Sequence, residues 1–172
     1  MYMRKVFIII VIALNSFLLF SQNVGTEMYQ LSQIRHNVKS KQVSSYDRSG
    51  GNGDCLSGIQ DGAKVTIFDV KGAGIINRIW ITIAPGAAQL NRNNIVMRMY
   101  WDGNAFPSVE SPIGPFFGNG WDESYNFVSV PLAVSPGDGK SYVSYFAMPF
   151  ANAARLEIEN QTGQKIDAFY FN

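Results

Sequence analysis

The sequence has one histidine, His36, and one cysteine, Cys55, among its 172 residues. One cysteine cannot form an intramolecular disulfide, so the folded state has to be stabilised by its hydrophobic core. One histidine disfavours Ser-His-Asp and Cys-His catalysis, as well as metal sites that need several histidines. The sequence therefore predicts no metal and no other cofactor. A Ca²⁺ ion held by loop carbonyls and one or two Asp residues would, however, leave little trace in the sequence.

The chain also lacks an excess of charge of either sign. Lys and Arg number 14, Asp and Glu number 13, and the formal net charge is +1 at pH 7. This balance disfavours nucleic acid and anionic membranes as partners, because both attract strongly basic proteins. Hydrophobic residues, in contrast, make up 47% of the chain, with 12 Phe and 8 Tyr. This composition suits the core of one domain.

Residues 1–21 have the pattern of a secretory signal peptide. Arg4 and Lys5 form a basic start, an apolar run continues to Phe20, and Ser21 offers a small residue at a cleavage point. The run is short for a membrane span, so an uncleaved anchor is the less favoured alternative. No cysteine directly follows the run, so lipid attachment is not expected. The protein is therefore predicted to be secreted or periplasmic.

The remaining chain divides at about residue 44. Residues 22–43 are polar and weakly patterned, with Leu31, Ile34 and Val38 at helical spacing, and we interpret them as a linker with a short helix. Residues 44–172 are predicted to form one β-sandwich domain.

Period-2 alternation of apolar and polar residues runs through this domain from Ala63 onward, with turn signals between the segments. About seven or eight short strands with almost no helical periodicity indicate an all-β fold, an antiparallel β-sandwich of jelly-roll type. The clearest strands are expected at residues 63–70, 75–83, 95–101, 125–132, 141–148, 154–159 and 165–171.

Carboxylates are the remaining candidates for chemistry, and several lie in segments that read as polar loops. These are Asp47, Asp54, Asp102, Glu110, Asp122 and Glu123. Glu110 is the best catalytic candidate, because Pro107 and Pro112 stiffen the segment around it and aromatic residues lie nearby in sequence. A carboxylate beside aromatic rings suits a sugar-binding cleft. The alternative is a turn packed on its own aromatics.

A second candidate segment is the glycine-rich loop at residues 44–54. Asp47 and Arg48 are adjacent there, and in a loop both can converge on a ligand hydroxyl. The alternative is a polar turn closed by an internal hydrogen bond of the Asp side chain. We expect a single substrate-binding region formed by Asp47, Arg48, Trp101, Asp102, Glu110 and Trp121.

Six short motifs occur in an order that resembles a known family. They are Tyr46–Asn52, Asp69–Trp80, Arg98–Gly103, Pro107–Glu110, Phe116–Gly118 and Met148–Phe150. Together they are similar to the N-terminal half of the DUF2961 proteins, grouped as glycoside hydrolase family 172. The chain departs from that pattern at Ser49, where Thr is usual, at Ala73, where Pro is usual, and at Ser111 and Pro115.

The resemblance implies a double jelly roll, a homo-oligomer with sites near subunit contacts, and action on furanosides. Implied partners are oligo- or polysaccharides with α-linked fructofuranosyl or D-arabinofuranosyl units. Family members are about twice as long, and the resemblance places both catalytic carboxylates in the half that this sequence lacks. The domain is therefore expected to be truncated at its C-terminus, with an unsatisfied sheet edge at residues 169–172.

Three functions remain open from the sequence. The chain is the N-terminal part of an exported retaining glycosidase that is incomplete for catalysis, with its catalytic residues unknown. Alternatively, it is a carbohydrate-binding sandwich that uses Trp101, Trp121 and loop acids without cleaving the sugar. The third function is structural, with the aromatic residues forming only the core.

Overall fold

The computed structural model describes residues 33–34, 36–137 and 139–172. The predicted signal peptide and Leu31 of the predicted short helix lie outside these residues. From residue 36 to residue 43 the described chain forms a turn and irregular structure, without a helix. In the part of the chain that the structure describes, no helix is long and apolar enough to cross a membrane. Residues 41–172 form one compact unit.

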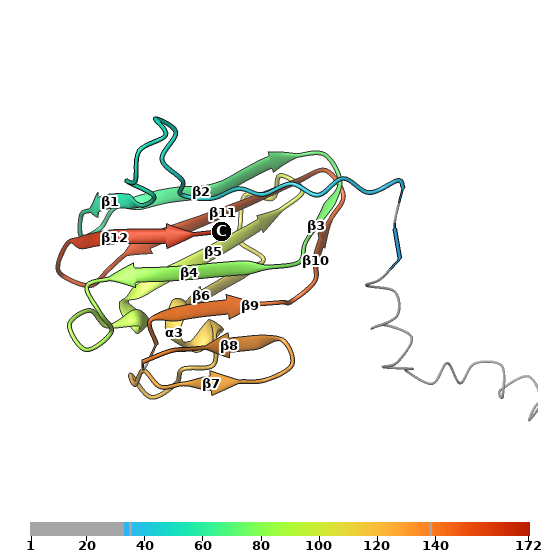
Figure 1. The fold of residues 1–172 in the computed structure, drawn as a ribbon. Helices are drawn as coiled ribbons and strands as arrows, with labels where there is room; N and C mark the ends of the chain where they lie inside the picture. Colours follow the sequence, from blue (N-terminus) through green and yellow to red (C-terminus); the bar gives the residue numbers. More distant parts are fainter. Residues whose placement is uncertain (1–32, 35, 138) are drawn as a thin grey trace, which may run out of the picture. The chain divides into compact units, whose positions relative to one another are not determined.

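This unit contains two large antiparallel sheets and a two-stranded ribbon (Figure 1). The six-stranded sheet has the order β1 (Leu56–Ile59), β12 (Ile166–Phe171), β4 (Ile79–Ala84), β9 (Ser141–Ser144), β8 (Leu132–Val134) and β7 (Phe127–Val128). The four-stranded sheet has the order β2 (Lys64–Lys71), β11 (Ala153–Asn160), β5 (Ile95–Trp101) and β6 (Val109–Pro112). A two-stranded ribbon joins β3 (Gly74–Ile76) to β10 (Met148–Phe150), and two short helical turns are η1 (Arg92–Asn94) and α3 (Ile113–Phe116).

The hydrophobic core includes the alternating buried residues of both sheets. Ile81 of β4 and Phe169 of β12 are fully buried, as are Met97 of β5 and Ile158 of β11. Strands β4, β5, β9 and β11 have one buried and one more exposed face because their side chains alternate. Burying the apolar faces against each other is the main driving force for folding. The all-β sandwich predicted from the sequence is therefore confirmed.

The strands pair in a nested order. β1 pairs with β12, β2 with β11, β3 with β10 and β4 with β9, so the chain forms one long hairpin that folds over itself. This winding is the jelly-roll arrangement. The β3–β10 ribbon, at the right of Figure 1, is one of the places where the chain passes between the two sheets.

Three predicted strands are in fact two strands each. The segment 75–83 is interrupted at Asn77 and Arg78, and its halves β3 and β4 belong to different sheets. The segment 125–132 is divided between β7 and β8, and the segment 141–148 between β9 and β10. The prediction was wrong here because hydrophobic periodicity marks extended chain but does not mark where that chain changes its pairing partner.

Glu110 lies on a strand, whereas we expected it on a loop. Strand β6 pairs only with β5 and is an edge of the four-stranded sheet. Proline is tolerated at such an edge because its missing N–H removes no bond from a central ladder. The two prolines that made this segment read as a loop are therefore compatible with a short edge strand.

The expected unsatisfied edge at residues 169–172 is absent, so that prediction is wrong. Strand β12 lies between β1 and β4, inside the six-stranded sheet. The backbone N–H of Asn172 donates to the Trp80 carbonyl at 3.0 Å, and Trp80 donates to the Asn172 carbonyl at 2.8 Å. The error has a topological cause, because a nested hairpin pairs the last strand with the first.

Candidate functional site

The Asp47 carboxylate organises its own loop. One oxygen accepts hydrogen bonds from the Ser49 backbone N–H at 2.9 Å and from the Ser49 hydroxyl at 2.6 Å, and the other accepts from the Gly53 N–H at 3.1 Å. These bonds lower the pKa of Asp47 below its usual value, with the Ser49 hydroxyl as the largest cause. The internally bonded turn, given above as the alternative, is what forms. Arg48 is exposed and lies 5.9 Å from the centre of the Tyr46 ring.

Asp102 joins two turns at the end of the sandwich where β5 ends and β11 begins. Its Oδ1 accepts hydrogen bonds from the backbone N–H groups of Ala151, Asn152 and Ala153, at 2.9, 2.6 and 3.2 Å. The Asn152 bond is the largest of the effects that lower the pKa of Asp102. Trp101, one residue earlier, is half-buried and packs against the hydrophobic core.

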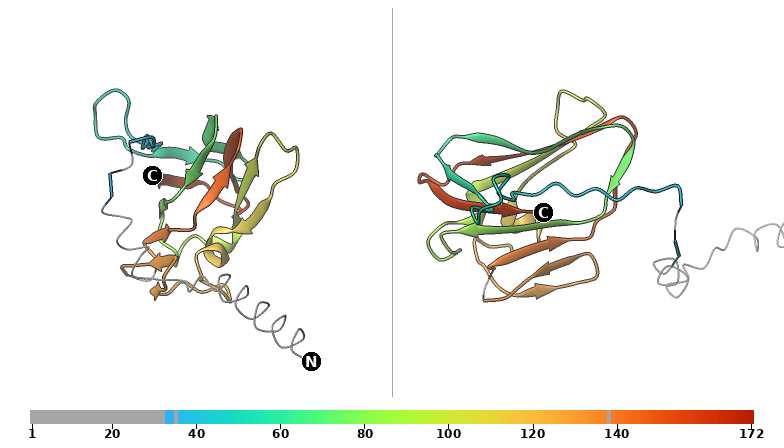
Figure 2. Two further views of the ribbon diagram at one scale, coloured as in Figure 1. Left: turned by 90° about the vertical axis from the view of Figure 1, so that its right-hand side faces the viewer. Right: turned by 45° about the horizontal axis from the view of Figure 1, so that its top comes forward.

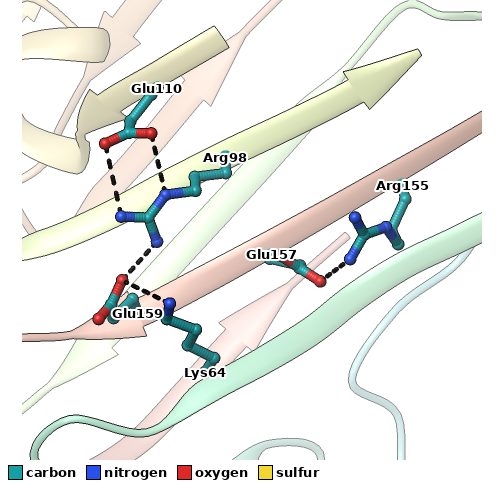
Figure 3. Close-up of polar contacts among 6 residues, drawn as sticks. All are labelled: Lys64, Arg98, Glu110, Arg155, Glu157 and Glu159. Atoms are coloured by element: carbon teal, nitrogen blue, oxygen red, sulfur yellow. Dashed lines mark hydrogen bonds and ion pairs between the residues drawn. The ribbon is translucent and has the colours of Figure 1, made fainter. Parts of the chain in front are cut away.

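Glu110 belongs to a row of charges on the outer face of the four-stranded sheet (Figure 3). Its carboxylate lies 3.1 Å from Nε of Arg98 on β5. The same guanidinium contacts Glu159 on β11, and Glu159 lies 3.7 Å from the ammonium group of Lys64 on β2. The row therefore crosses all four strands with alternating sign.

A catalytic role for the carboxylates of this row stays a prediction. A retaining glycosidase needs one carboxylate as nucleophile and one protonated carboxyl group as acid. Arg98 contacts both Glu110 and Glu159, and its hydrogen bond lowers the pKa of Glu159. Because Arg98 favours the ionised form of Glu159, this carboxyl group is poorly suited to act as the protonated acid.

The structure does not bring all the predicted site residues together. The loop that carries Asp47 is attached to the six-stranded sheet, where the Ser45 N–H donates to the Phe171 carbonyl at 3.1 Å. The left view of Figure 2 shows this loop and the loop after β5 on opposite sides of the two sheets. Trp121 lies in a third segment, with its side chain 88% exposed. A role for these residues in substrate binding stays a prediction.

A pocket of about 700 Å³ is lined by residues of four connections. These connections lie at the end of the sandwich opposite the β3–β10 ribbon (Figure 1). They are the connections between β4 and β5, α3 and β7, β8 and β9, and β11 and β12. Among the residues that line the pocket are Gln89, Asn91, Arg92, Asn93, Asp122, Glu123, Ser124, Lys140, Thr162 and Gln164. Amides, carboxylates and hydroxyls of this kind offer both donors and acceptors to a ligand.

Asp122 is held against η1 by two amides of the pocket wall. The side-chain amide of Asn91 donates to Asp122 Oδ1 at 3.2 Å, and the side-chain amide of Asn93 donates to the same oxygen. The Asn93 bond is the larger cause of the lowered pKa of Asp122. Trp121 and Asp122 both have left-handed backbone conformations, with φ of 55° and 59°, which L-residues adopt at a cost.

Arg92 stabilises the β4–β5 connection, which forms one wall of the pocket. Its side chain is buried, and its Nη2 donates to the carbonyls of Ile83 and Pro85, both at 2.9 Å. Its Nη1 donates to the Leu90 carbonyl at 3.0 Å. These bonds hold the start and end of the β4–β5 connection together. Burial lowers the pKa of Arg92, and the nearby Tyr142 partly offsets this effect.

Sequence reasoning missed most of this pocket. Asp122 and Glu123 were among the acidic candidates, but the partners of Asp122 are 29 and 31 positions away along the chain. The polar run from Asn91 to Asn94 was the available signal, and in the sequence it reads as an ordinary loop.

A family model described as GH172 domain-like matches residues 56–170. No curated protein matches the chain in sequence. The match covers every strand described above except the last residue of β12, and it agrees with the resemblance that the six motifs indicated. The chain therefore belongs to the GH172 domain-like family, which relates it to the glycoside hydrolases.

Proposed function

We propose that this domain binds carbohydrate, in the pocket between η1 and the Asp122 segment, as the N-terminal jelly roll of an exported glycoside hydrolase. The proposed ligands are α-linked furanosides with fructofuranosyl or D-arabinofuranosyl units. The family membership supports the relation to sugar chemistry. The resemblance of the six motifs supports the choice of furanosides.

The observation that carries the proposal is the lining of the pocket. Sugar hydroxyls each donate and accept, and the side chains of Gln89, Asn91 and Gln164 offer both functions, whereas Asp122 offers charged acceptors. Trp121 directly precedes Asp122, and its ring is almost fully exposed. An exposed indole next in sequence to a residue of the pocket can cover the apolar face of a sugar ring.

The domain alone is expected to bind the sugar without hydrolysing it. Hydrolysis with retention needs two carboxyl groups about 5–5.5 Å apart, one of them protonated. Glu159 and Asp122 both have lowered pKa values, and Glu110 is paired with Arg98. The environments of Glu159 and Asp122 therefore favour their ionised forms, which supports binding over catalysis.

Titration calorimetry with methyl α-D-arabinofuranoside and methyl α-D-fructofuranoside tests the proposal. We expect Asp122→Asn to weaken binding about ten- to a hundredfold, because a hydrogen bond to a charged group contributes about 1.5–3 kcal/mol. Asp167→Asn is the matched control, since Asp167 is exposed on β12 and pairs with Lys165. Equal affinities for Asp122→Asn and the control would contradict the pocket as the binding site.

A second variant, Glu110→Gln, tests whether the sugar binds on the charged face of the four-stranded sheet instead. If Glu110→Gln weakens binding and Asp122→Asn does not, the sugar binds on the charged face of the four-stranded sheet. An assay with aryl α-D-arabinofuranoside then tests catalysis directly. Turnover by the chain that disappears in Glu110→Gln would make Glu110 catalytic and would contradict binding without hydrolysis.

Export and self-association belong to the same proposal. The basic and apolar pattern of residues 1–21 supports export, and the motif resemblance supports a homo-oligomer. N-terminal sequencing of the protein from the medium or periplasm tests export, with Gln22 as the expected first residue. Light scattering tests the oligomeric state.

A further inference from the structure

The outer faces of the two large sheets differ in chemistry. The four-stranded sheet carries the charged row described above. On the six-stranded sheet, the central outward positions are Trp80, Thr82 and Ala84 on β4, Ser141 and Val143 on β9, and Ala168 and Tyr170 on β12. They alternate with buried residues such as Ile81 and Phe169. None of these outward positions carries a charged side chain.

Three aromatic side chains follow one diagonal of this face, across the neighbouring strands β9, β4 and β12 (Figure 1). Tyr170 pairs in register with Thr82, two positions after Trp80 along β4. On the other side, Val143 pairs with Trp80, and Tyr145 comes two positions later. Because β9 runs antiparallel to β4, Tyr145 lies toward the start of β4 and Tyr170 toward its end. Diagonal neighbours are about 7–8 Å apart, so the line is about 15 Å long.

The three side chains are accessible from solvent. Tyr145 is 55% exposed, and Trp80 and Tyr170 are half-buried. The Tyr145 backbone N–H donates to the Pro131 carbonyl at 2.7 Å, which continues the β8–β9 pairing and keeps Tyr145 on the outward side of the alternation. The Trp80 Nε1 donates to the Ser141 hydroxyl at 2.9 Å. The polar edge of the indole is therefore bonded within the sheet, which leaves the ring for apolar contacts.

The chemistry and the width of this line fit a neutral sugar chain. A sugar ring packs its apolar face on aromatic rings and presents hydroxyls at its edge. Arg78 and Asn172 lie beside Trp80, bonded to each other at 3.2 Å, and have further donors for such hydroxyls. A line about 15 Å long and one side chain wide is narrow for a protein partner, since stable protein interfaces bury about 800 Å² per partner. The uncharged strand positions match an uncharged ligand.

We propose that Tyr145, Trp80 and Tyr170 form a second carbohydrate site, which binds an extended, neutral polysaccharide along the outer face of the six-stranded sheet. None of the three side chains lines the pocket. The inference therefore goes beyond the proposed function, in which the pocket takes single furanoside units. The line is long enough to contact more than one sugar ring of a polymer.

Affinity gel electrophoresis of the full chain tests this site. The gels contain debranched arabinan, inulin or hydroxyethylcellulose, and the change of mobility with polysaccharide concentration gives the affinity. We expect at least one polymer to retard the protein, and Tyr145→Ala to weaken that binding about three- to tenfold, as for the loss of one aromatic contact. Adding Tyr170→Ala should weaken it further. Phe106→Ala is the matched control, because Phe106 is 84% exposed in the connection between β5 and β6.

Two further measurements separate this site from the pocket. In calorimetry, Tyr145→Ala should bind methyl α-D-arabinofuranoside as the unsubstituted protein does. In the gels, Asp122→Asn should still be retarded. If the methyl glycoside fails to bind while the polymer retards the protein, the proposed function is overturned and this inference stands.

The opposite results overturn the inference and leave the proposed function intact. One is an unsubstituted protein that none of the polymers retards. Another is equal retardation of Phe106→Ala and the variant with both tyrosines replaced. A third is a double variant that changes the mass measured by light scattering and not the retardation, because the face would then join copies of this chain.

Discussion

Asp102 shows how much of this fold can depend on one exposed carboxylate. Its left-handed conformation, with φ of 57°, turns the chain after β5 and directs the carboxylate to three successive N–H groups at the β10–β11 turn. Asp tolerates this conformation better than most residues because its short side chain can bond locally. A residue singled out as a ligand contact is therefore used to join two turns.

The lowered pKa of Asp102 predicts a pH-dependent contribution to stability. The folded-state pKa lies below the unfolded value of 3.8, so the stabilisation is fully present above that value and is lost as the pH falls through the folded-state pKa. We expect Asp102→Asn to lower the free energy of unfolding at neutral pH, and the difference from the original protein to shrink in acid. Urea unfolding at about pH 7 and about pH 2.5 measures this. A difference that stays the same at both pH values would contradict it.

At the scale of elements, the charged row on the outer face of the four-stranded sheet links the edge strand β6 to its neighbour β5. This edge strand has a single neighbour, β5, and Glu110 contacts Arg98 across that pair. Arg98 also contacts Glu159, whose side chain is only 14% exposed, whereas Glu110 is 54% exposed. Removing Arg98 therefore leaves a largely covered carboxylate without its closest cation.

This difference in exposure predicts unequal effects of two substitutions. We expect Arg98→Met to cost about 1–2 kcal/mol of the free energy of unfolding, because Glu159 loses a hydrogen-bonded cation. Glu110→Gln should cost about 0–1 kcal/mol, as is usual for exposed ion pairs. Urea denaturation of the two variants at one ionic strength provides the comparison. Equal losses would mean that the row stabilises the sheet only through long-range charge balance.

At the scale of the whole molecule, the nested hairpin places some strands inside a sheet and others at its edge. Strands β4, β12, β11 and β5 each have two paired neighbours and an alternating buried face. Strands β6 and β7 are edges, and the 44–54 loop is held mainly by its own hydrogen bonds. Local stability should therefore decrease from the centre of each sheet to its edge.

Hydrogen exchange measured by mass spectrometry tests this order. We expect the slowest exchange in β4, β12, β11 and β5 and faster exchange in β6, β7 and the 44–54 loop, because fewer buried contacts oppose local opening there. The central and edge segments can be compared within one digest, so each serves as the control for the other. Equal protection in β7 and β4 would contradict a stability gradient across the six-stranded sheet.

The amino-acid sequence by itself determined the all-β class, the family resemblance and the buried faces of the longest strands. The alternation in residues 95–101 correctly separates buried Met97 and Met99 from Arg98 and Tyr100. Such assignments succeed because the two faces of a strand differ in every second residue, which is a local property.

Only the tertiary structure decided which strands pair and where the pocket lies. Pairing in a nested hairpin joins residues more than a hundred positions apart, such as Leu56 and Phe169. The local alternation of apolar and polar residues does not indicate which strand will be the partner. The pocket forms for the same reason, because four connections meet only after both sheets have assembled. Arg92 reads as one more polar loop residue in the sequence, and it is buried because the folded chain supplies three carbonyls for its donors.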